Sequence, residues 1–159
     1  MKSKVKVSVL GATGMVGQIY ISLLNDHPWF EVVDIAASKN SSGKSFEEVL
    51  KNRWKIKKNI SDNINKLIIR DVFDFNLIPK NVQLVFTAAE LESKMKTQEL
   101  EFEYAKRGFA VVSNTSANRW TDDVPMIIPE INSDHLNIIK KQQKNRNLPK
   151  NGFVVSKSN

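Results

Sequence analysis

The sequence predicts an α/β protein: a Rossmann-like, doubly wound and mostly parallel sheet, in one domain over residues 1–159. Apolar, β-branched runs alternate along the chain with segments of helical periodicity, and a glycine-rich turn follows the first run. A strand, a glycine turn, a helix and a second strand within about 30 residues make a βαβ unit, whose strands run parallel.

The first βαβ unit occupies the start of the chain. Its expected elements are, in order, the strand Val5–Leu10, the helix Gln18–Asn25 and the strand Phe30–Ala36. The helix places Ile19, Leu23 and Leu24 on one side, and the polar stretch through Pro28 ends it.

The same alternation continues to the end of the chain. Further strands are expected at Leu67–Arg70, Val82–Thr87, Phe109–Val112 and Phe153–Val155, with a short apolar run at Met126–Ile128. Further helices are expected at Phe46–Lys51, Ser93–Arg107 and Asp134–Gln143. Leu100 and Tyr104 share one side of the second of these, which Gly108 stops, and Ser133 caps the third.

Composition excludes several classes of protein and site. No apolar stretch approaches the roughly 18 residues of a membrane span, and the amino terminus runs into a strand without a signal peptide, so we expect a cytoplasmic protein. The absence of cysteine excludes disulfides, thiolate ligands and a thiol nucleophile within these residues. The two histidines, His27 and His135, are far apart, and we expect no metal site.

The net charge of +7 raises the alternative of nucleic-acid binding. The most basic run, Lys51–Lys58, surrounds Trp54, and cations around an aromatic ring can bind single strands by charge and stacking. The run also fits a solvated surface segment, and no recognised nucleic-acid-binding module accompanies it. We favour the surface segment.

The glycine turn has its glycines at Gly11, Gly14 and Gly17. In a dinucleotide-binding turn, the first glycine allows a tight turn, the second lets the backbone approach a pyrophosphate, and the third lets the helix pack closely on the sheet. Amides of the first helical turn then face the phosphates. The alternative is a tight turn that binds no ligand, but the strands on both sides favour the nucleotide site.

The end of the second strand indicates which dinucleotide binds. An NAD-selective site has Asp or Glu there, bonded to the ribose 2′-hydroxyl. This strand instead leads into Ser38-Lys39-Asn40-Ser41, whose cation and hydroxyls suit a 2′-phosphate, and Asp34 comes too early. NADP is therefore favoured over NAD, with a solvated polar loop as the alternative.

A second polar turn, Val111–Trp120, follows a later strand at its carboxyl end, where open α/β sheets bind ligands. Its short polar side chains are those of Ser113, Asn114, Thr115 and Ser116. Arg119 adds a planar fork for a phosphate or carboxylate. We expect a ligand loop, since helix capping explains only one or two of these residues.

Four motifs in order resemble the aspartate-semialdehyde dehydrogenases, especially their archaeal-type branch: VSVLGATGMVG, AASKNSSGKSFEEV, VVSNTSANRWTDDVPMIIPEIN and GFVVSKSN. Malonyl-CoA reductases of the same superfamily look similar too. The resemblance spans essentially the whole chain. It implies reduction of aspartyl phosphate to aspartate semialdehyde with NADPH, a step toward lysine, threonine and methionine.

The resemblance also implies roles for individual residues. Those that would line the pyrophosphate are Gly11, Thr13, Gly14, Met15 and Val16. Those that would face the 2′-phosphate are Ser38, Lys39 and Ser41. Asn114 and Ser116 would lie near the nicotinamide, and Arg119 resembles the arginine that binds the substrate phosphate.

The family's nucleophile is a cysteine in a turn that reads Ser-Asn-Cys or Pro-Asn-Cys, whereas this sequence ends Ser158-Asn159. The family's general-base histidine and its oligomer contacts lie in a second domain. We therefore expect a cofactor-binding part that lacks the catalytic domain, is inactive alone and belongs to a homo-oligomeric enzyme. A smaller departure is Ala88-Ala89-Glu90, where the archaeal-type branch has an apolar residue and proline.

Two alternatives stay open. One is a reductase of malonyl-CoA or succinyl-CoA from the same superfamily. The other is a nucleotide-binding protein that has the fold without the chemistry.

Overall fold

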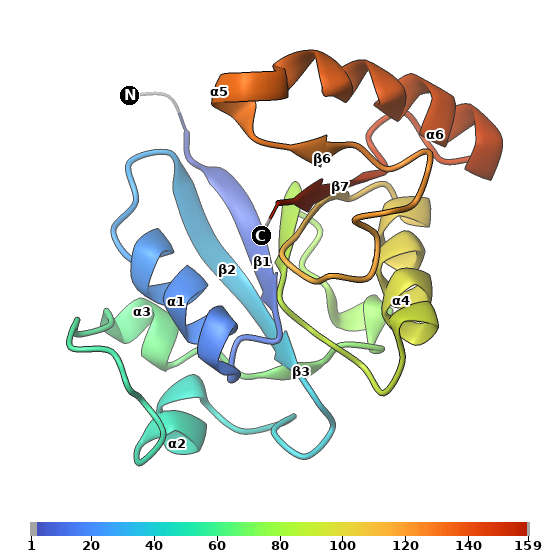
Figure 1. Ribbon diagram of the computed structural model, residues 1–159. Coiled ribbons are helices and arrows are strands. Elements are labelled where there is room, and N and C mark those ends of the chain that lie inside the picture. Colours follow the sequence, from blue (N-terminus) through green and yellow to red (C-terminus); the bar gives the residue numbers. More distant parts are fainter. Residues whose placement is uncertain (1–2, 159) are drawn as a thin grey trace. The chain divides into compact units, whose positions relative to one another are not determined.

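A computed structural model describes residues 3–158, which form two compact units (Figure 1). The first unit ends at Ala89 and the second begins at Glu90. Asn159, the last residue of the motif that resembles the family's catalytic turn, lies outside the described residues. No helix within the described range has the length and apolar character needed to cross a bilayer.

The first unit contains a parallel sheet with the strand order β3-β2-β1-β4. Its elements are β1 (Val5–Leu10), α1 (Met15–Leu24), β2 (Phe30–Ala37), α2 (Phe46–Leu50), α3 (Asp62–Asn65), β3 (Arg70–Asp71), the 3₁₀ turn η1 (Phe75–Leu77) and β4 (Leu84–Thr87). Helix α1 packs against β1 and β2 (Figure 1). The apolar core lies between them and includes Val7, Val9, Ile21 and Ile35.

The orientation of α1 differs from the predicted one. Ile19 and Leu23 are 47% and 65% exposed, and the buried apolar side chains are Ile21 and Leu24. The cause is Gly17, where a Cβ would lie 2.0 Å from the carbonyl oxygen of Gly11. Because this glycine must face the sheet, the positions four and seven residues later face it too.

The basic run Lys51–Lys58 folds back onto the first unit. The Lys58 Nζ donates hydrogen bonds to the carbonyls of Ser22 (2.9 Å) and Asn25 (3.3 Å), at the carboxyl end of α1. The Trp54 indole donates to the Lys58 carbonyl at 3.2 Å. Lys58 therefore binds the carboxyl end of α1, where a cation is favourable.

The second unit contains the parallel strand order β5-β7-β6. Its elements are α4 (Lys94–Lys106), β5 (Ala110–Ser113), β6 (Met126–Ile127), α5 (Pro129–Asn132), the 3₁₀ turn η2 (Ser133–Asn137), α6 (Ile138–Arg146) and β7 (Phe153–Lys157). Helix α4 packs against β5 and β7, and α6 packs against β7 (Figure 1). The α/β class with parallel strands is confirmed.

Helix α4 forms as the sequence predicts. The Ser93 side chain accepts a hydrogen bond from the Lys96 amide, Leu100 and Tyr104 are buried, and Gly108 ends the helix at φ +90°. A left-handed residue directly after the last turn is the usual glycine stop.

The prediction that Ser133 caps a helix over Asp134–Gln143 is wrong. The helical path begins earlier, with Pro129 in the first turn of α5, and Ser133 itself has helical dihedrals (φ −56°, ψ −26°). Proline suits a first helical turn because its missing amide has no intrahelical partner there. The α6 helix then starts only at Ile138.

The predicted strand Leu67–Arg70 is also placed differently. Ile68 forms an antiparallel bridge with Ser45, and parallel pairing with β2 begins at Arg70. The Ile69 amide donates to the Lys44 carbonyl at 2.9 Å. Ile69 therefore bonds to the polar loop after β2 and not, as the prediction required, to a strand of the sheet.

Candidate functional site

The glycine turn is hydrogen-bonded to the end of β2. The amides of Gly11 and Ala12 both donate to the carbonyl of Ala36, at 2.8 and 3.2 Å. Gly11 has φ +73°, and a Cβ there would lie 2.8 Å from the backbone of Ala88. Glycine is therefore required at position 11 by backbone conformation and by the neighbouring chain.

Gly14 differs from the other two glycines of the turn. Its φ is −75° and its ψ is 168°, which any residue adopts, and a Cβ there would meet no atom closer than the Gly11 carbonyl oxygen at 3.4 Å. A Cβ at Gly17, in contrast, would clash at 2.0 Å. The fold needs glycine at positions 11 and 17 but not at 14, where the missing side chain leaves the backbone open to a ligand.

The start of α1 is suited to an anion. Gly14 occupies the N-cap position without a side-chain hydrogen bond, and the first turn contains no acidic residue. Gly14, Met15 and Val16 are exposed, while the Thr13 carbonyl accepts from the Gln18 side chain at 3.2 Å. Uncapped amides and the positive end of the helix dipole fit a phosphate group.

The loop after β2 lies at the same edge of the sheet. Leu10 and Ala36 are register partners at the ends of β1 and β2, so the turn over positions 11–16 and the loop over positions 38–41 leave the sheet together. The Ser41 amide donates to the Ser38 carbonyl at 2.9 Å. Ser38 and Lys39 are exposed, and Ser41 is buried.

Asp34 is not available to a ribose. Its carboxylate accepts from the Arg70 Nη2 at 2.7 Å, from the Arg70 Nε at 3.2 Å and from the Ser8 hydroxyl at 2.5 Å. Asp34 and Arg70 are both buried. Asp34, the acid of β2 nearest the loop, therefore forms a buried ion pair and does not bond to a ribose 2′-hydroxyl. This agrees with a cofactor site that has no acid for that hydroxyl.

The second polar turn has two sides. Ser113, Thr115 and Asn118 are buried and donate hydrogen bonds to the carboxylate of Glu101 on α4, at 2.6, 2.8 and 2.6 Å. The polar side chains between them in sequence are those of Asn114 and Ser116, which are partly exposed. Three of the polar residues thus hold the turn, and the alternate ones are presented outward.

Burial raises the pKa of the Glu101 carboxyl, and the hydrogen bonds from Ser113, Asn118 and Thr115 offset only part of that effect. A fully buried carboxyl with a raised pKa is a common feature of functional sites. Glu101 was not predicted from the sequence because it lies between two other glutamates of the helix, Glu99 and Glu103.

Two cations meet at Asn114. The Arg119 Nη2 donates to the Asn114 carbonyl at 3.2 Å, and the Lys157 Nζ donates to the Asn114 Oδ1 at 3.2 Å. Lys157 is a second residue that was not predicted from the sequence. The signal that could have found it is the parallel register, in which Ser113 pairs with Ser156, so the ends of β5 and β7 lie side by side.

The sequence profile of the family described as "Semialdehyde dehydrogenase, NAD binding domain" matches residues 6–139. The chain belongs to this family.

Curated relatives support the same family. The aspartate-semialdehyde dehydrogenase of Archaeoglobus fulgidus is 40% identical over 153 residues, which cover 96% of this chain and 42% of that protein. The malonyl CoA reductase (NADP) of Metallosphaera sedula is 33% identical and is covered to 41%, with 98% of this chain matched. The chain thus spans about 42% of the length of the curated relatives it matches.

A solved structure shares the fold. The crystal structure of aspartate-semialdehyde dehydrogenase with NADP from Candida albicans superimposes with a TM-score of 0.81 at 30% identity, over 99% of this chain and 43% of that one. The predicted resemblance and the Rossmann-like class are both confirmed.

The structure brings the predicted site residues together in two groups, each within one unit. Residues at positions 11–16 and 38–41 gather at one sheet edge of the first unit. Asn114, Ser116 and Arg119 gather at the end of β5 in the second unit, where Ser116 lines a cavity of about 220 Å³ with Ser93 and Thr115.

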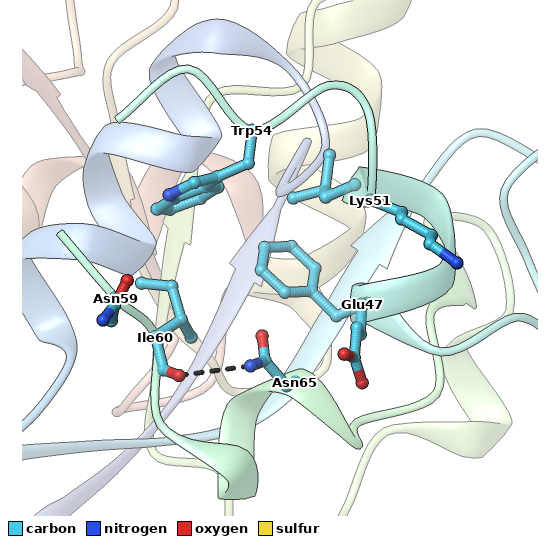
Figure 2. Close-up of a pocket in the computed structure, with 8 residues that line it drawn as sticks. Glu47, Lys51, Trp54, Asn59, Ile60 and Asn65 are labelled. Carbon is cyan, nitrogen blue, oxygen red and sulfur yellow. Dashed lines mark hydrogen bonds between the residues drawn. The ribbon is translucent and has the colours of Figure 1, made fainter. Parts of the chain in front are cut away.

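A larger cavity of the first unit, about 400 Å³, lies elsewhere (Figure 2). Figure 2 shows Trp54 on one side of it and Ile60 and Asn65 on the other, with the Asn65 side chain donating to the Ile60 carbonyl at 3.1 Å. None of the predicted cofactor residues lines this cavity. Size alone therefore does not locate the candidate site.

Proposed function

We propose that this domain binds NADP and is the cofactor-binding part of an aspartate-semialdehyde dehydrogenase, an enzyme that reduces aspartyl phosphate to aspartate semialdehyde. The observation that carries the proposal is the glycine turn: positions 11 and 17 are glycines that the fold requires, and position 14 is one that it does not require. A glycine without a role in packing, at the uncapped start of a helix, is explained by a phosphate that approaches the backbone.

Each part of the cofactor has candidate partners in the domain. The first-turn amides of α1, which starts at Met15, would bind the pyrophosphate. Lys39 would bind the 2′-phosphate together with the hydroxyls of Ser38 and Ser41. Asn114 and Ser116 would contact the nicotinamide from the outward side of their turn. When bound, NADPH supplies the hydride.

Arg119 is the proposed partner of the substrate phosphate. Its Nη2 is held by the Asn114 carbonyl at 3.2 Å, and Lys157 approaches the same asparagine from β7. Two cations beside one residue suit a phosphate dianion. The sequence contains no cysteine, so we propose that these 159 residues bind cofactor without turning over substrate. We place the whole enzyme in the cytosol as a homo-oligomer.

A second candidate function is the reduction of a CoA thioester, which the 33% identity to a malonyl CoA reductase favours. Assays of the whole protein with aspartyl phosphate and with malonyl-CoA separate the two reactions. A third candidate is a nucleotide-binding protein without catalysis. That reading requires that the whole protein reduce neither substrate while its NADP affinity stays intact.

The test of cofactor binding is Gly14→Ala. The added methyl group meets only an ordinary contact in the protein, so the variant should fold and lose at most about 1 kcal/mol as a poorer N-cap. The methyl would stand where the pyrophosphate approaches, and NADP affinity measured by calorimetry should fall about 10-fold or more. Leu23→Ala, on the exposed side of the same helix, is the control and should bind as the wild type does. Wild-type affinity in Gly14→Ala would refute the proposed site.

A further inference from the structure

The outward presentation of Asn114 and Ser116 depends on a buried group behind them. The Glu101 carboxylate is fully buried in α4 and has three donors around it: the hydroxyls of Ser113 and Thr115 on one oxygen and the Asn118 amide on the other. An ionised carboxylate only accepts hydrogen bonds, so it can satisfy all three donors at once.

The hydroxyls of Ser113 and Thr115 also bond to the backbone of the loop. Each hydroxyl has one proton and can donate it to Glu101; the two hydroxyl oxygens also lie 3.0 Å apart, where either could donate to the other. The lone pairs of each hydroxyl oxygen face the loop backbone. The Ser113 Oγ accepts from the Thr115 amide at 3.1 Å, and the Thr115 Oγ1 accepts from the Ala117 amide at 3.3 Å. The carboxylate therefore sets the direction of hydroxyls that in turn hold two amides of the loop.

The alternation of the loop follows from this chain of hydrogen bonds. Ser113 and Thr115 point toward Glu101, so Asn114 and Ser116 point away from it. We propose that Glu101 is the positioning residue of this loop: by accepting three hydrogen bonds, it holds Asn114 and Ser116 in place for the nicotinamide end of NADP. The inference rests on the proposed function for its ligand and on the geometry alone for the loop.

A purely structural role for Glu101 would look different. Burying a carboxylate costs free energy, and an apolar side chain of similar size would fill the same volume without that cost. If filling were the only role, Glu101→Leu would leave the path of the loop unchanged. If Glu101 positions the loop, the leucine variant should keep the fold of the unit and lose the loop geometry.

The first experiment is amide hydrogen exchange, followed by NMR, on the 159-residue protein. In Glu101→Leu the amides of Thr115 and Ala117 should exchange at least 10-fold faster than in the wild type, relative to the amides of β5. Glu101→Gln should restore part of the protection, because its carbonyl oxygen still accepts. The control is Gln142→Leu, since Gln142 is equally buried and bonds to Asp123 and Val154 instead of the loop. A uniform change across the unit in Glu101→Leu would overturn the proposal.

The second experiment compares two ligands by calorimetry: NADP, and adenosine 2′,5′-bisphosphate, which lacks the nicotinamide. Glu101→Leu should weaken NADP at least 5-fold and leave the bisphosphate unchanged. Equal weakening of both ligands, or of neither, would overturn the role of Glu101 in ligand binding. A wild-type domain that binds neither ligand would refute the proposed cofactor instead, and the exchange data would still decide whether Glu101 positions the loop.

Discussion

Arg70 and Asp34 form a two-point ion pair in the interior of the first unit, with N–O distances of 2.7 and 3.2 Å. Arg70→Met would leave the carboxylate buried with the Ser8 hydroxyl as its remaining side-chain donor. Removing one partner of a buried pair costs about 3–5 kcal/mol, and we expect that loss in urea unfolding. The double variant Asp34→Leu/Arg70→Met should recover most of it. A single-variant loss under about 1 kcal/mol would contradict this account.

Gly17 and Gly152 should be the glycines least tolerant of alanine. A Cβ would lie 2.0 Å from the Gly11 carbonyl oxygen in the first case and 1.9 Å from the Ala105 carbonyl oxygen in the second. Neither backbone atom can move without shifting a packed element, so we expect each variant to lose about 3 kcal/mol or more of unfolding free energy. Gly14→Ala is the matched comparison. Similar losses in all three variants would show that the close contacts are not the cause.

Lys39→Glu should change which cofactor is preferred. A carboxylate at this exposed position repels a 2′-phosphate and can accept from a 2′-hydroxyl, so NADP affinity should fall about 10-fold while NAD affinity holds or rises. Thermal shift with each cofactor measures the difference. Lys44→Glu, in the same loop, controls for net charge and should have a smaller effect. Equal weakening of both cofactors by Lys39→Glu would point to misfolding of the loop.

The stability of the domain should depend on pH through Glu101. Its folded pKa is raised above the ordinary value of 4.5, so the folded state binds the proton more tightly than the unfolded state does. The free energy of unfolding should therefore fall as pH rises from the unfolded pKa through the folded one. Urea unfolding of the wild type and Glu101→Gln, between about pH 4 and pH 8, measures the difference. A difference that stays constant, or that changes in the wild type's favour as pH rises, would contradict the raised pKa.

Local signals in the sequence predict much of the fold. β1 spans Val5–Leu10 as expected, because a β-branched run beside a glycine turn has few alternatives. Helix α4 lies within the predicted range Ser93–Arg107 and ends at the predicted Gly108 stop. In both cases the predictive signal lies within the element itself or in the residues directly beside it.

The features that were not predicted depend on contacts between separate parts of the fold. The rotation of α1 follows from Gly17 against the Gly11 carbonyl, and apolar periodicity alone points to the wrong face. Glu101 finds its donors 12 to 17 residues away, and Lys157 reaches Asn114 from 43 residues away. Such pairings become visible only when the register of the parallel strands is known.

In the loop after β5, the positions that bond to Glu101 and the positions that face outward differ in how freely they can mutate. Changes at 113, 115 or 118 disturb the hydrogen bonds of a buried charge, so selection for a folded domain acts against them. Changes at 114 and 116 alter the presented surface and leave the carboxylate network untouched. A new ligand preference can therefore arise at the outward positions in small steps, each compatible with a folded protein.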